Sequence, residues 1–171
     1  MRLIPDIYVH KIEDIPYDKL KEEGIKALVF DLDNTLATLD EKACPERVKK
    51  IINKLNKDFT CFIVTNGNGK RAKPYKDKLN IKIISMALKP FTKGLRELEK
   101  KYHLKKSEMV IIGDQLMTDI LSGKRFGIKT VLVDPLAKKD LKMTYFNRFI
   151  ENKIIKHYEK KDLFKRWRYY E

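Results

Sequence analysis

The sequence predicts an α/β fold, with helices on both faces of a parallel β-sheet. Short apolar runs rich in β-branched residues alternate with longer charged segments of helical periodicity, which is the pattern of strands joined by helical crossovers. Acidic and other polar residues follow directly after several of the apolar runs. Because ligands bind at the carboxyl ends of the strands in open parallel sheets, the same pattern locates a candidate functional site.

The individual strands and helices can be assigned in order along the chain. The expected strands are residues 27–30, 59–64, 109–112 and 128–133, with a weaker candidate at 81–85. The expected helices between them are residues 45–56, 70–79, 92–102 and 117–125. Pro45 and Gly127 are start and stop signals for two of these helices. A short helix over residues 17–23, ended by Gly24, precedes the first strand.

The length of the chain favours one domain with terminal extensions. A chain of 171 residues with 43% hydrophobic content can bury a single core. We expect an N-terminal extension with the short helix over residues 1–24, a core domain over residues 25–137, and a basic, aromatic, amphipathic helical tail over residues 138–171.

Cysteine usage and hydropathy predict a cytoplasmic protein, or one that is peripheral on the inner face of the membrane. Cys44 and Cys61 have neither the spacing of a zinc site nor the density of a disulfide scaffold, which fits a reducing compartment. No apolar run approaches the roughly 20 residues that span a bilayer, and the N-terminal region lacks the apolar stretch of a signal peptide.

The chain is strongly basic, and its C-terminal part mixes basic with apolar residues. A formal net charge of +14 attracts polyanions such as nucleic acid or an anionic membrane. The apolar residues of this tail are Met143, Phe146, Phe149, Ile150, Ile154, Tyr158, Leu163, Phe164, Trp167, Tyr169 and Tyr170. The basic residues among them are Arg148, Lys153, Lys156, Lys165, Arg166 and Arg168.

This mixture suits the headgroup level of an anionic bilayer, so an anionic phospholipid membrane surface is the expected partner. Two alternatives remain open. In one, the helix packs on the domain and its charges are solvated. In the other, the tail binds nucleic acid, although no recognised binding motif accompanies it. No obligate protein partner is inferred.

Two carboxylates follow the first expected strand. Asp31 and Asp33 lie in the segment DLDNTL, residues 31–36, where the strand gives way to a loop. One carboxylate can attack phosphorus to form an acyl phosphate, while the other protonates the leaving alkoxide and then activates water. The alternative interpretation is an Asp-rich surface turn.

Three further polar elements follow later strands. Thr65 and Asn66, before Gly67, offer a hydroxyl and an amide that suit phosphate oxygens. Lys89 precedes Pro90 and could neutralise a transferring phosphoryl group, although one lysine among many carries little weight. The segment GDQLMTD, residues 113–119, supplies Asp114 and Asp119. Acids that converge with Asp31 form the oxygen-lined site that Mg²⁺ prefers.

Taken together, DxDxT, Thr-Asn, Lys-Pro and GDxxxxD resemble the four motifs of the haloacid dehalogenase (HAD) superfamily. The resemblance covers residues 27–133. It implies a Rossmann-like sheet, Mg²⁺ dependence and an aspartyl-phosphate intermediate. It also implies that Asp31 is the nucleophile and a metal ligand, and that Asp33 is the general acid/base whose backbone carbonyl binds metal. An Asp at position 33 favours a phosphatase over a phosphoryl transferase.

The same resemblance implies roles for the other polar residues. Thr65 and Lys89 are the expected catalytic residues that orient the phosphate and neutralise its charge, and with Asn66 they form the expected substrate-binding set. Asp114 is the expected acidic metal ligand. Asp119 either binds metal or only holds its loop.

The spacing of the motifs leaves no room for the cap domain that usually encloses small substrates in this superfamily. Residues 33–65 are filled by a loop, a helix and a strand, and residues 66–89 by a helix and a strand. An uncapped site is accessible to large or membrane-bound substrates.

This layout, the two acidic motifs and the element Phe146-Asn147-Arg148-Phe149 resemble the YqeG family of IIIA-type phosphatases, which is similar to mitochondrial phosphatidylglycerophosphate phosphatases. The resemblance implies phosphatidylglycerophosphate as the substrate. The alternatives are a phosphatase of a soluble or macromolecular phosphoester, and a non-catalytic basic module that binds RNA or the ribosome.

Overall fold

The structure, a computed structural model, describes residues 3–137, 142–161 and 163–168. The side chains of residues 142–148 lie outside this description, and with them the predictions made for Met143, Phe146 and Arg148. Tyr169 and Tyr170 also lie outside the described residues.

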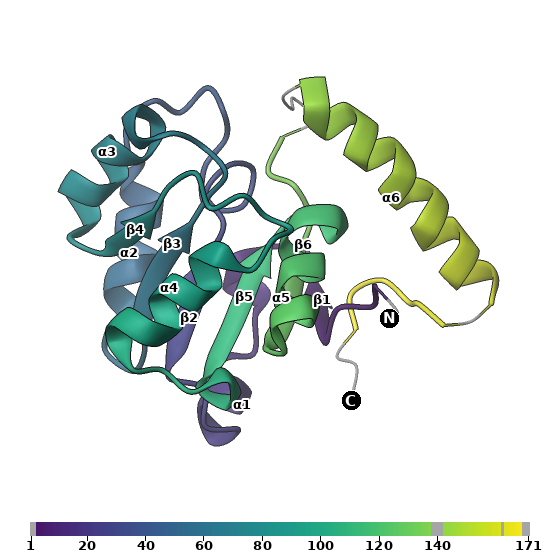
Figure 1. The fold of residues 1–171 in the computed structure, drawn as a ribbon, viewed down its shortest axis with the longest axis horizontal. Helices are drawn as coiled ribbons and strands as arrows, with labels where there is room; N and C mark the ends of the chain where they lie inside the picture. The colour runs from purple at the N-terminus through teal and green to yellow at the C-terminus, as the bar shows by residue number, and fades with distance from the viewer. Residues whose placement is uncertain (1–2, 138–141, 162, 169–171) are drawn as a thin grey trace.

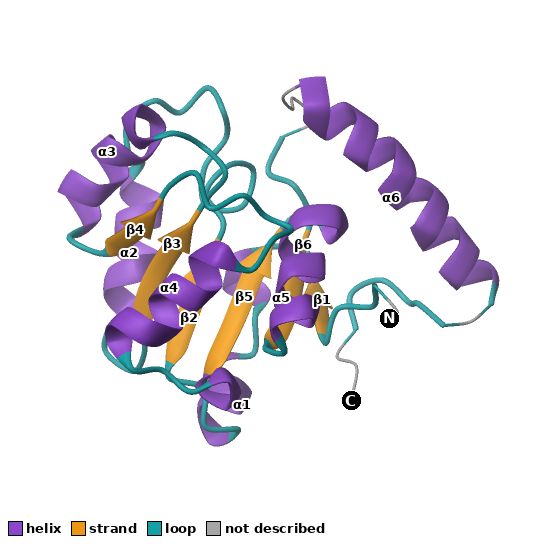
Figure 2. Ribbon diagram, viewed as in Figure 1, coloured by secondary structure: helices purple, strands orange, loops and turns teal. Residues whose placement is uncertain are grey.

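One parallel sheet of six strands forms the centre of the molecule (Figures 1 and 2). The strand order is β1-β6-β5-β2-β3-β4, and every pairing is parallel. The strands are β1 (Ile7–Val9), β2 (Ala27–Phe30), β3 (Thr60–Val64), β4 (Lys82–Ile84), β5 (Met109–Gly113) and β6 (Lys129–Val133). The predicted parallel sheet is confirmed, and each of the five expected strands is present to within one residue at either end.

The helices also follow the predicted order. They are α1 (Tyr17–Glu22), α2 (Glu46–Leu55), α3 (Gly69–Leu79), α4 (Lys93–Tyr102), α5 (Leu121–Phe126) and α6 (Lys142–Lys160). Short 3₁₀ segments are η1 (Ile12–Asp14) and η2 (Lys106–Glu108), and η3 (Leu116–Ile120) is a π-helical turn. Gly127 ends α5 at φ 84°, as the stop signal predicts. Pro45 precedes α2 instead of lying inside it.

Helices cover both faces of the sheet. On one face, α1, α2 and α3 pack through Leu20, Ile52 and Tyr75 against alternate strand residues such as Leu28 and Ile63. On the other face, Leu95 and Leu98 of α4 and Phe126 of α5 pack against Val29 and Ile111. Because successive side chains of a strand point to opposite faces, strands buried on both faces read as continuous apolar runs. This is the signal that predicted them.

One strand was not predicted. Residues 7–9 form β1, an edge strand that pairs with β6 in the register Ile7↔Val131. The segment expected to be an extension is therefore part of the sheet at this point. Three apolar residues followed by His10 are too short a run to be recognised as a strand.

The C-terminal segment packs against the β1 edge of the domain. Ile155 of α6 and Phe164 are buried with Tyr8 and Leu132, and the ring of Trp167 stacks on His10 with centroids 3.9 Å apart. The backbone N–H of Tyr8 donates to the carbonyl of Arg168 at 2.8 Å. These apolar tail residues therefore contact the domain. Among the described residues, none of the helices combines the length and the apolar character required to cross a membrane.

Candidate active site

The site lies where the strand order reverses. From β2 the chain adds β3 and β4 on one side, and then β5 and β6 on the other. Phe30 of β2 is opposite Ile112 of β5, and the Asp31 N–H donates to the Ile112 carbonyl at 2.8 Å. Asp31 and Asp114 therefore emerge side by side at the carboxyl ends of neighbouring strands. This is the crevice in which open α/β sheets bind ligands.

Lys89 joins two of the predicted acids. Its ammonium Nζ donates to Asp31 Oδ1 and to Asp119 Oδ1, each at 2.6 Å. The three side chains are 3%, 8% and 0% exposed. A lysine buried in this way neutralises acids that could not otherwise ionise together away from water.

Asn66 holds the backbone of Lys89. Its side-chain amide donates to the Lys89 carbonyl at 2.9 Å, and its Oδ1 accepts from the Lys89 N–H at 2.7 Å. The structure thus shows Asn66 in a positioning contact with the loop that carries Lys89. Its substrate-binding role stays a prediction.

Three acids form a compact oxygen cluster. Asp31, Asp114 and Asp119 are buried, and each offers one carboxylate oxygen within 4.8 Å of the others. The Thr35 hydroxyl donates to Asp114 Oδ1 at 3.0 Å and orients that carboxylate. Hard oxygen donors at this spacing fit a divalent metal ion.

The Asp119 side chain packs directly against the backbone of Gly113. A Cβ built on Gly113 would lie 2.2 Å from Asp119 Cγ, so only glycine fits at this point. The Gln115 N–H donates to Asp119 Oδ2 at 3.2 Å. The Gln115 carbonyl accepts from the N–H groups of both Asp119 and Ile120, which widens η3 into a π-turn. The helix expected over residues 117–125 is therefore divided into η3 and α5, and the widened turn directs Asp119 back over Gly113.

Burial and like charges shape the electrostatics of the cluster. Burial raises the pKa of Asp31 to about 8, with Asp119 and Asp114 adding to the rise and the Lys89 ammonium opposing it. Burial alone would lower the pKa of Lys89, but Asp119 and Asp31 more than offset this and raise it above the ordinary value. Lys89 is therefore cationic. A further cation would favour the ionised form of Asp31.

The Asp33 carboxylate lies outside this cluster and pairs with Arg71. The guanidinium Nε of Arg71 donates to Asp33 Oδ1 at 2.7 Å. The same guanidinium donates to the Glu41 carbonyl at 2.6 Å and to the Thr38 carbonyl at 3.0 Å. Burial would lower the pKa of Arg71, but its bonds with Asp33 and Tyr75 raise it. Arg71 thus fixes Asp33 and the following loop together.

Sequence reasoning missed Arg71. The one available signal is its position in the first turn of a helix that follows a motif loop, where α3 begins after the Asn68 cap. The predicted metal contact of the Asp33 backbone carbonyl stays a prediction, as does the catalytic role of its side chain.

Thr65 is fully buried beside Asp33. Its hydroxyl accepts from the Gly67 N–H at 3.0 Å. A Cβ on Gly67 would lie 3.2 Å from Thr65 Oγ1 and 3.5 Å from Asp33 Oδ2. The loop after β3 therefore passes close to both side chains, which places the predicted phosphate-binding residue next to the predicted acid/base.

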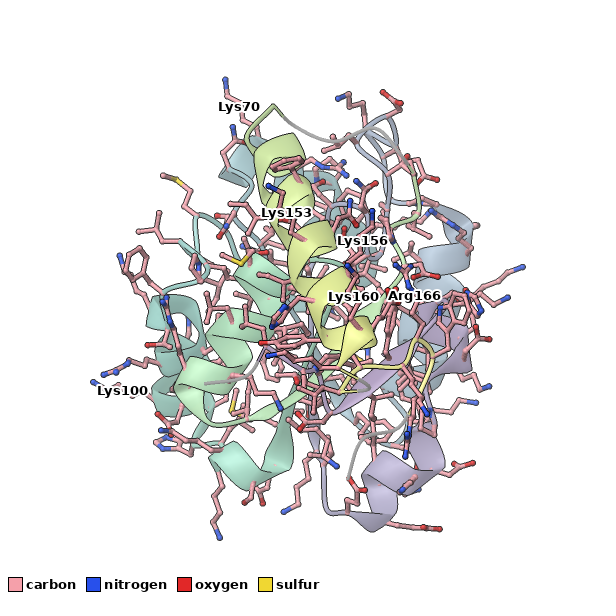
Figure 3. All side chains as sticks on the ribbon, turned by 90° about the vertical axis from the view of Figure 1, so that its right-hand side faces the viewer. Lys70, Lys100, Lys153, Lys156, Lys160 and Arg166 are labelled. Carbon is pink, nitrogen blue, oxygen red and sulfur yellow. The ribbon has the colours of Figure 1, made fainter. Side chains whose placement is uncertain are left out.

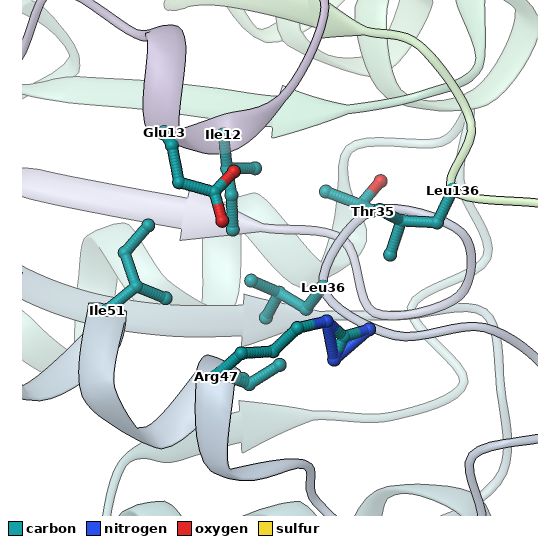
Figure 4. Close-up of a pocket in the computed structure, with 8 residues that line it drawn as sticks. Ile12, Glu13, Thr35, Leu36, Arg47, Ile51 and Leu136 are labelled. Carbon is teal, nitrogen blue, oxygen red and sulfur yellow. The ribbon is translucent and has the colours of Figure 1, made fainter.

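A small pocket lies beside the first motif, with Glu13 on η1 and Arg47 on α2 contributing to its walls (Figure 4). Its lining residues are Ile12, Glu13, Thr35, Leu36, Arg47, Val48, Ile51 and Leu136. None of the three clustered acids lines it. Thr35 contributes to the pocket wall and also donates to Asp114, so it lies between the pocket and the acid cluster.

Comparison with known proteins identifies the family. Residues 1–137 match the model of the family described as mitochondrial PGP phosphatase. The chain belongs to this family. The Bacillus subtilis member named "Probable phosphatase YqeG" is 38% identical over 159 residues, which are 92% of each chain. The PGP phosphatase family and this relative establish the chain as a phosphatase, and the expected resemblance to the YqeG family is confirmed.

A second relative is longer than this chain. Phosphatidylglycerophosphate phosphatase 1, chloroplastic/mitochondrial, of Arabidopsis thaliana is 28% identical over 148 residues, which are 81% of this chain and 42% of that protein. The chain thus spans less than half of the plant relative.

The fold of this PGP phosphatase-family chain also has solved counterparts. A haloacid dehalogenase-like hydrolase from Streptococcus pneumoniae superposes with a TM-score of 0.51 at 15% identity, covering 64% of this chain and 84% of that chain. The likeness shows the fold, which is the expected HAD-type Rossmann-like sheet.

Proposed function

We propose that the chain is a Mg²⁺-dependent phosphomonoesterase that uses Asp31 as its nucleophile and phosphatidylglycerophosphate as its substrate. The observation that carries the proposal is the contact of one buried ammonium, Lys89, with both Asp31 and Asp119 at the carboxyl end of the sheet. A carboxylate held at this point beside a fixed positive charge can approach an anionic phosphate without net repulsion.

The residues support a two-step displacement. In the first step an Asp31 carboxylate oxygen attacks phosphorus, and the bond from phosphorus to the ester oxygen breaks as Asp33 transfers a proton to that oxygen. In the second step Asp33 takes a proton from water, whose oxygen attacks phosphorus. The acyl-phosphate bond breaks, and inorganic phosphate leaves with Asp31 restored. Lys89 offsets the charge of the phosphoryl oxygens in both steps.

Asp31, Asp114 and Asp119 would hold the divalent ion, and Thr35 would keep Asp114 in place. When bound, Mg²⁺ supplies positive charge that polarises the phosphoryl group and neutralises the clustered acids. We propose Mg²⁺ in preference to Ca²⁺ because a small octahedral ion suits few carboxylates completed by water and phosphate oxygens.

The proposed substrate rests on the family of the chain and on the short connections between its strands. The plant relative is named for phosphatidylglycerophosphate. In the described chain, the connection from β2 to β3 carries only α2 and that from β3 to β4 only α3, an arrangement compatible with an open site. A phosphate at the headgroup of a lipid could enter such a site while its acyl chains stay in the bilayer.

The basic surface supports a cytoplasmic protein that lies peripherally on the inner face of the membrane. Lys153, Lys156 and Lys160 are exposed along α6, and Arg166 follows that helix (Figure 3). An anionic bilayer attracts each basic residue near its surface by about 1 kcal/mol, screened by salt. Phe164 is buried against the domain and Trp167 stacks on His10. Although Phe149 is exposed on α6, we assign the proposed attraction of the tail to its charges.

Phosphate release tests the proposal directly. With Mg²⁺, phosphatidylglycerophosphate in vesicles should be hydrolysed faster than a panel of soluble phosphoesters. EDTA should abolish the activity, and Mg²⁺ but not Ca²⁺ should restore it. Asp31→Asn should remain folded and release no phosphate. Faster hydrolysis of a soluble ester than of the lipid would show that the substrate is not phosphatidylglycerophosphate. Activity retained in Asp31→Asn would overturn the covalent mechanism.

A further inference from the structure

The connection between β4 and α4 exposes three large apolar side chains. Met86, Leu88 and Phe91 are 63%, 55% and 69% exposed. Half of the six large hydrophobic residues that are exposed in the described chain thus fall within residues 86–91, which we call the apolar loop. Single exposed apolar residues are ordinary, but a cluster marks an interaction surface.

The backbone of the apolar loop is anchored, so these side chains are presented outward. The Met86 N–H donates to the Gly67 carbonyl at 2.9 Å, and the N–H of buried Ala87 donates to the Thr65 carbonyl at 3.0 Å. Met86 and Leu88 have φ values of 51° and 57°, a left-handed conformation that L residues with large side chains rarely adopt. The loop therefore holds an unfavourable backbone conformation while exposing its apolar groups.

The apolar loop also carries a residue of the candidate active site. Lys89 points inward to Asp31 and Asp119, whereas its neighbour Leu88 is exposed. The loop that carries the three apolar side chains therefore runs past the carboxyl end of the sheet, where Figure 1 shows the connection from β4 to α4. Anything that binds them is brought close to Asp31.

The charged residues that flank the apolar loop in the sequence are positive from Lys78 to Arg96. Residues 78–96 contain no Asp or Glu, and Lys93 and Arg96 are exposed in the first turn of α4. Exposed Arg125 donates to the Pro90 carbonyl at 3.4 Å. An apolar cluster with a basic border complements the interface of an anionic bilayer, where apolar groups enter the acyl region and basic groups meet headgroups.

We propose that the apolar loop inserts into the interfacial region of an anionic bilayer and so places the acid cluster over the headgroup phosphate of a lipid. The proposal deepens the proposed function and rests on it. It assigns the insertion to residues 86–91, and leaves to the basic tail a long-range attraction.

A double variant, Met86→Asn with Phe91→Ser, tests the proposal and leaves Leu88 beside Lys89 intact. Asn is chosen because it tolerates positive φ. Co-sedimentation with phosphatidylglycerol vesicles should weaken at least tenfold, and turnover of vesicle-embedded phosphatidylglycerophosphate should fall with it. Hydrolysis of p-nitrophenyl phosphate and the melting temperature should be unchanged. The matched control is Leu136→Ser, which removes an exposed apolar side chain outside the loop and should preserve vesicle binding.

The depth to which the apolar loop enters the bilayer can be measured independently of activity. In a Trp167→Phe background, Phe91→Trp provides a single tryptophan within the apolar loop. Brominated phosphatidylglycerol in the vesicles should quench its fluorescence. Quenching without hydrolysis of the lipid phosphate would support insertion of the apolar loop and would contradict phosphatidylglycerophosphate as the substrate. Hydrolysis of the lipid without quenching, equal losses on both substrates in the double variant, or unchanged vesicle binding would overturn the insertion.

Discussion

Two cations organise the acids of this site, and they do so in different surroundings. Lys89 is 3% exposed and lies between Asp31 and Asp119. Arg71 is 13% exposed and its Asp33 partner 20%, so this second pair is partly reached by water. The compact ammonium serves two carboxylates, whereas the planar guanidinium serves one carboxylate and two backbone carbonyls.

The difference in exposure between the two pairs matches the catalytic role proposed for Asp31 and for Asp33. Asp31 must keep a fixed position to attack phosphorus, and its contact with Lys89 opposes the rise in pKa that burial causes. Asp33 must exchange protons with a leaving group and with water, which needs access to solvent. Arg71 binds Oδ1 of Asp33, while Oδ2 is the oxygen that lies near Gly67 and Thr65. In the proposed mechanism the two pairs would separate charge stabilisation from proton transfer.

The largest expected effect comes from removing the buried cation. Lys89→Met leaves Asp31 and Asp119 in a buried site without their shared ammonium. Breaking a buried ion pair in this way costs about 3–5 kcal/mol. Urea denaturation in EDTA at neutral pH should show this loss in the free energy of unfolding. Millimolar Mg²⁺ should recover part of it, because an ion that binds only the folded state stabilises that state.

If Mg²⁺ raised the free energy of unfolding of neither Lys89→Met nor the unmodified chain, the assignment of the cluster as a cation site would be contradicted. Lys93→Met, which removes an exposed lysine four residues away, is the control and should unfold as the unmodified chain does.

A smaller effect is expected at the point where the backbone makes room for Asp119. In Gly113→Ala the new Cβ would lie 2.2 Å from Asp119 Cγ, so Asp119 must move and its contact with Lys89 must lengthen. Overpacking of this kind costs about 1–3 kcal/mol. Urea denaturation measures that cost, and Mg²⁺ titration should show weaker activation. Gly69→Ala, where the Cβ meets no atom within 4 Å, should leave Mg²⁺ activation unchanged.

Arg71→Lys should be milder for stability and more informative about chemistry. Lysine keeps the charge but cannot reach one carboxylate and two carbonyls with a fixed fork. We expect a loss of about 1–2 kcal/mol in the free energy of unfolding, because the lost hydrogen bonds are partly replaced by water. A positioning role predicts a lower kcat with an altered pH profile and little change in KM. A change in KM alone would instead assign Arg71 to substrate binding.

These two pairs also mark how far the sequence could predict the site. Asp31 and Asp114 follow strands that are buried on both faces, so periodicity located them at the carboxyl ends without any further information. Lys89 follows a weak strand in a chain with 38 Lys and Arg residues, and only the resemblance to a family singled it out. The register of β3 with β4, Val64↔Ile84, explains why its loop reaches the site.

Arg71 could not be predicted in the same way. Its partners Asp33, Thr38 and Glu41 are 38, 33 and 30 residues away in the sequence, and helical periodicity describes only near neighbours. The π-turn of η3 was missed for a related reason. The turn accompanies the close packing of Asp119 on Gly113, which a pattern of apolar residues does not encode.

The smallest effect is expected for the ion pair of Lys26 and Glu108, which is about as short as the pairs of Lys89 but has an exposed lysine. Lys26 Nζ lies 2.7 Å from Glu108 Oε1, and the Lys26 side chain is 71% exposed. The Lys26 ammonium, followed by the Lys105 N–H, lowers the pKa of Glu108. A lowered carboxyl pKa contributes stability above the unfolded-state value and loses it as pH falls through the folded-state value. Glu108 is 19% exposed, but water solvates the Lys26 ammonium and lysine entropy opposes the contact, so Lys26→Met should leave the urea midpoint at pH 7 unchanged within error. A midpoint loss comparable to that of Lys89→Met would show that distance, and not burial, decides the strength of these pairs, and would remove the distinction drawn between the two cations of the site.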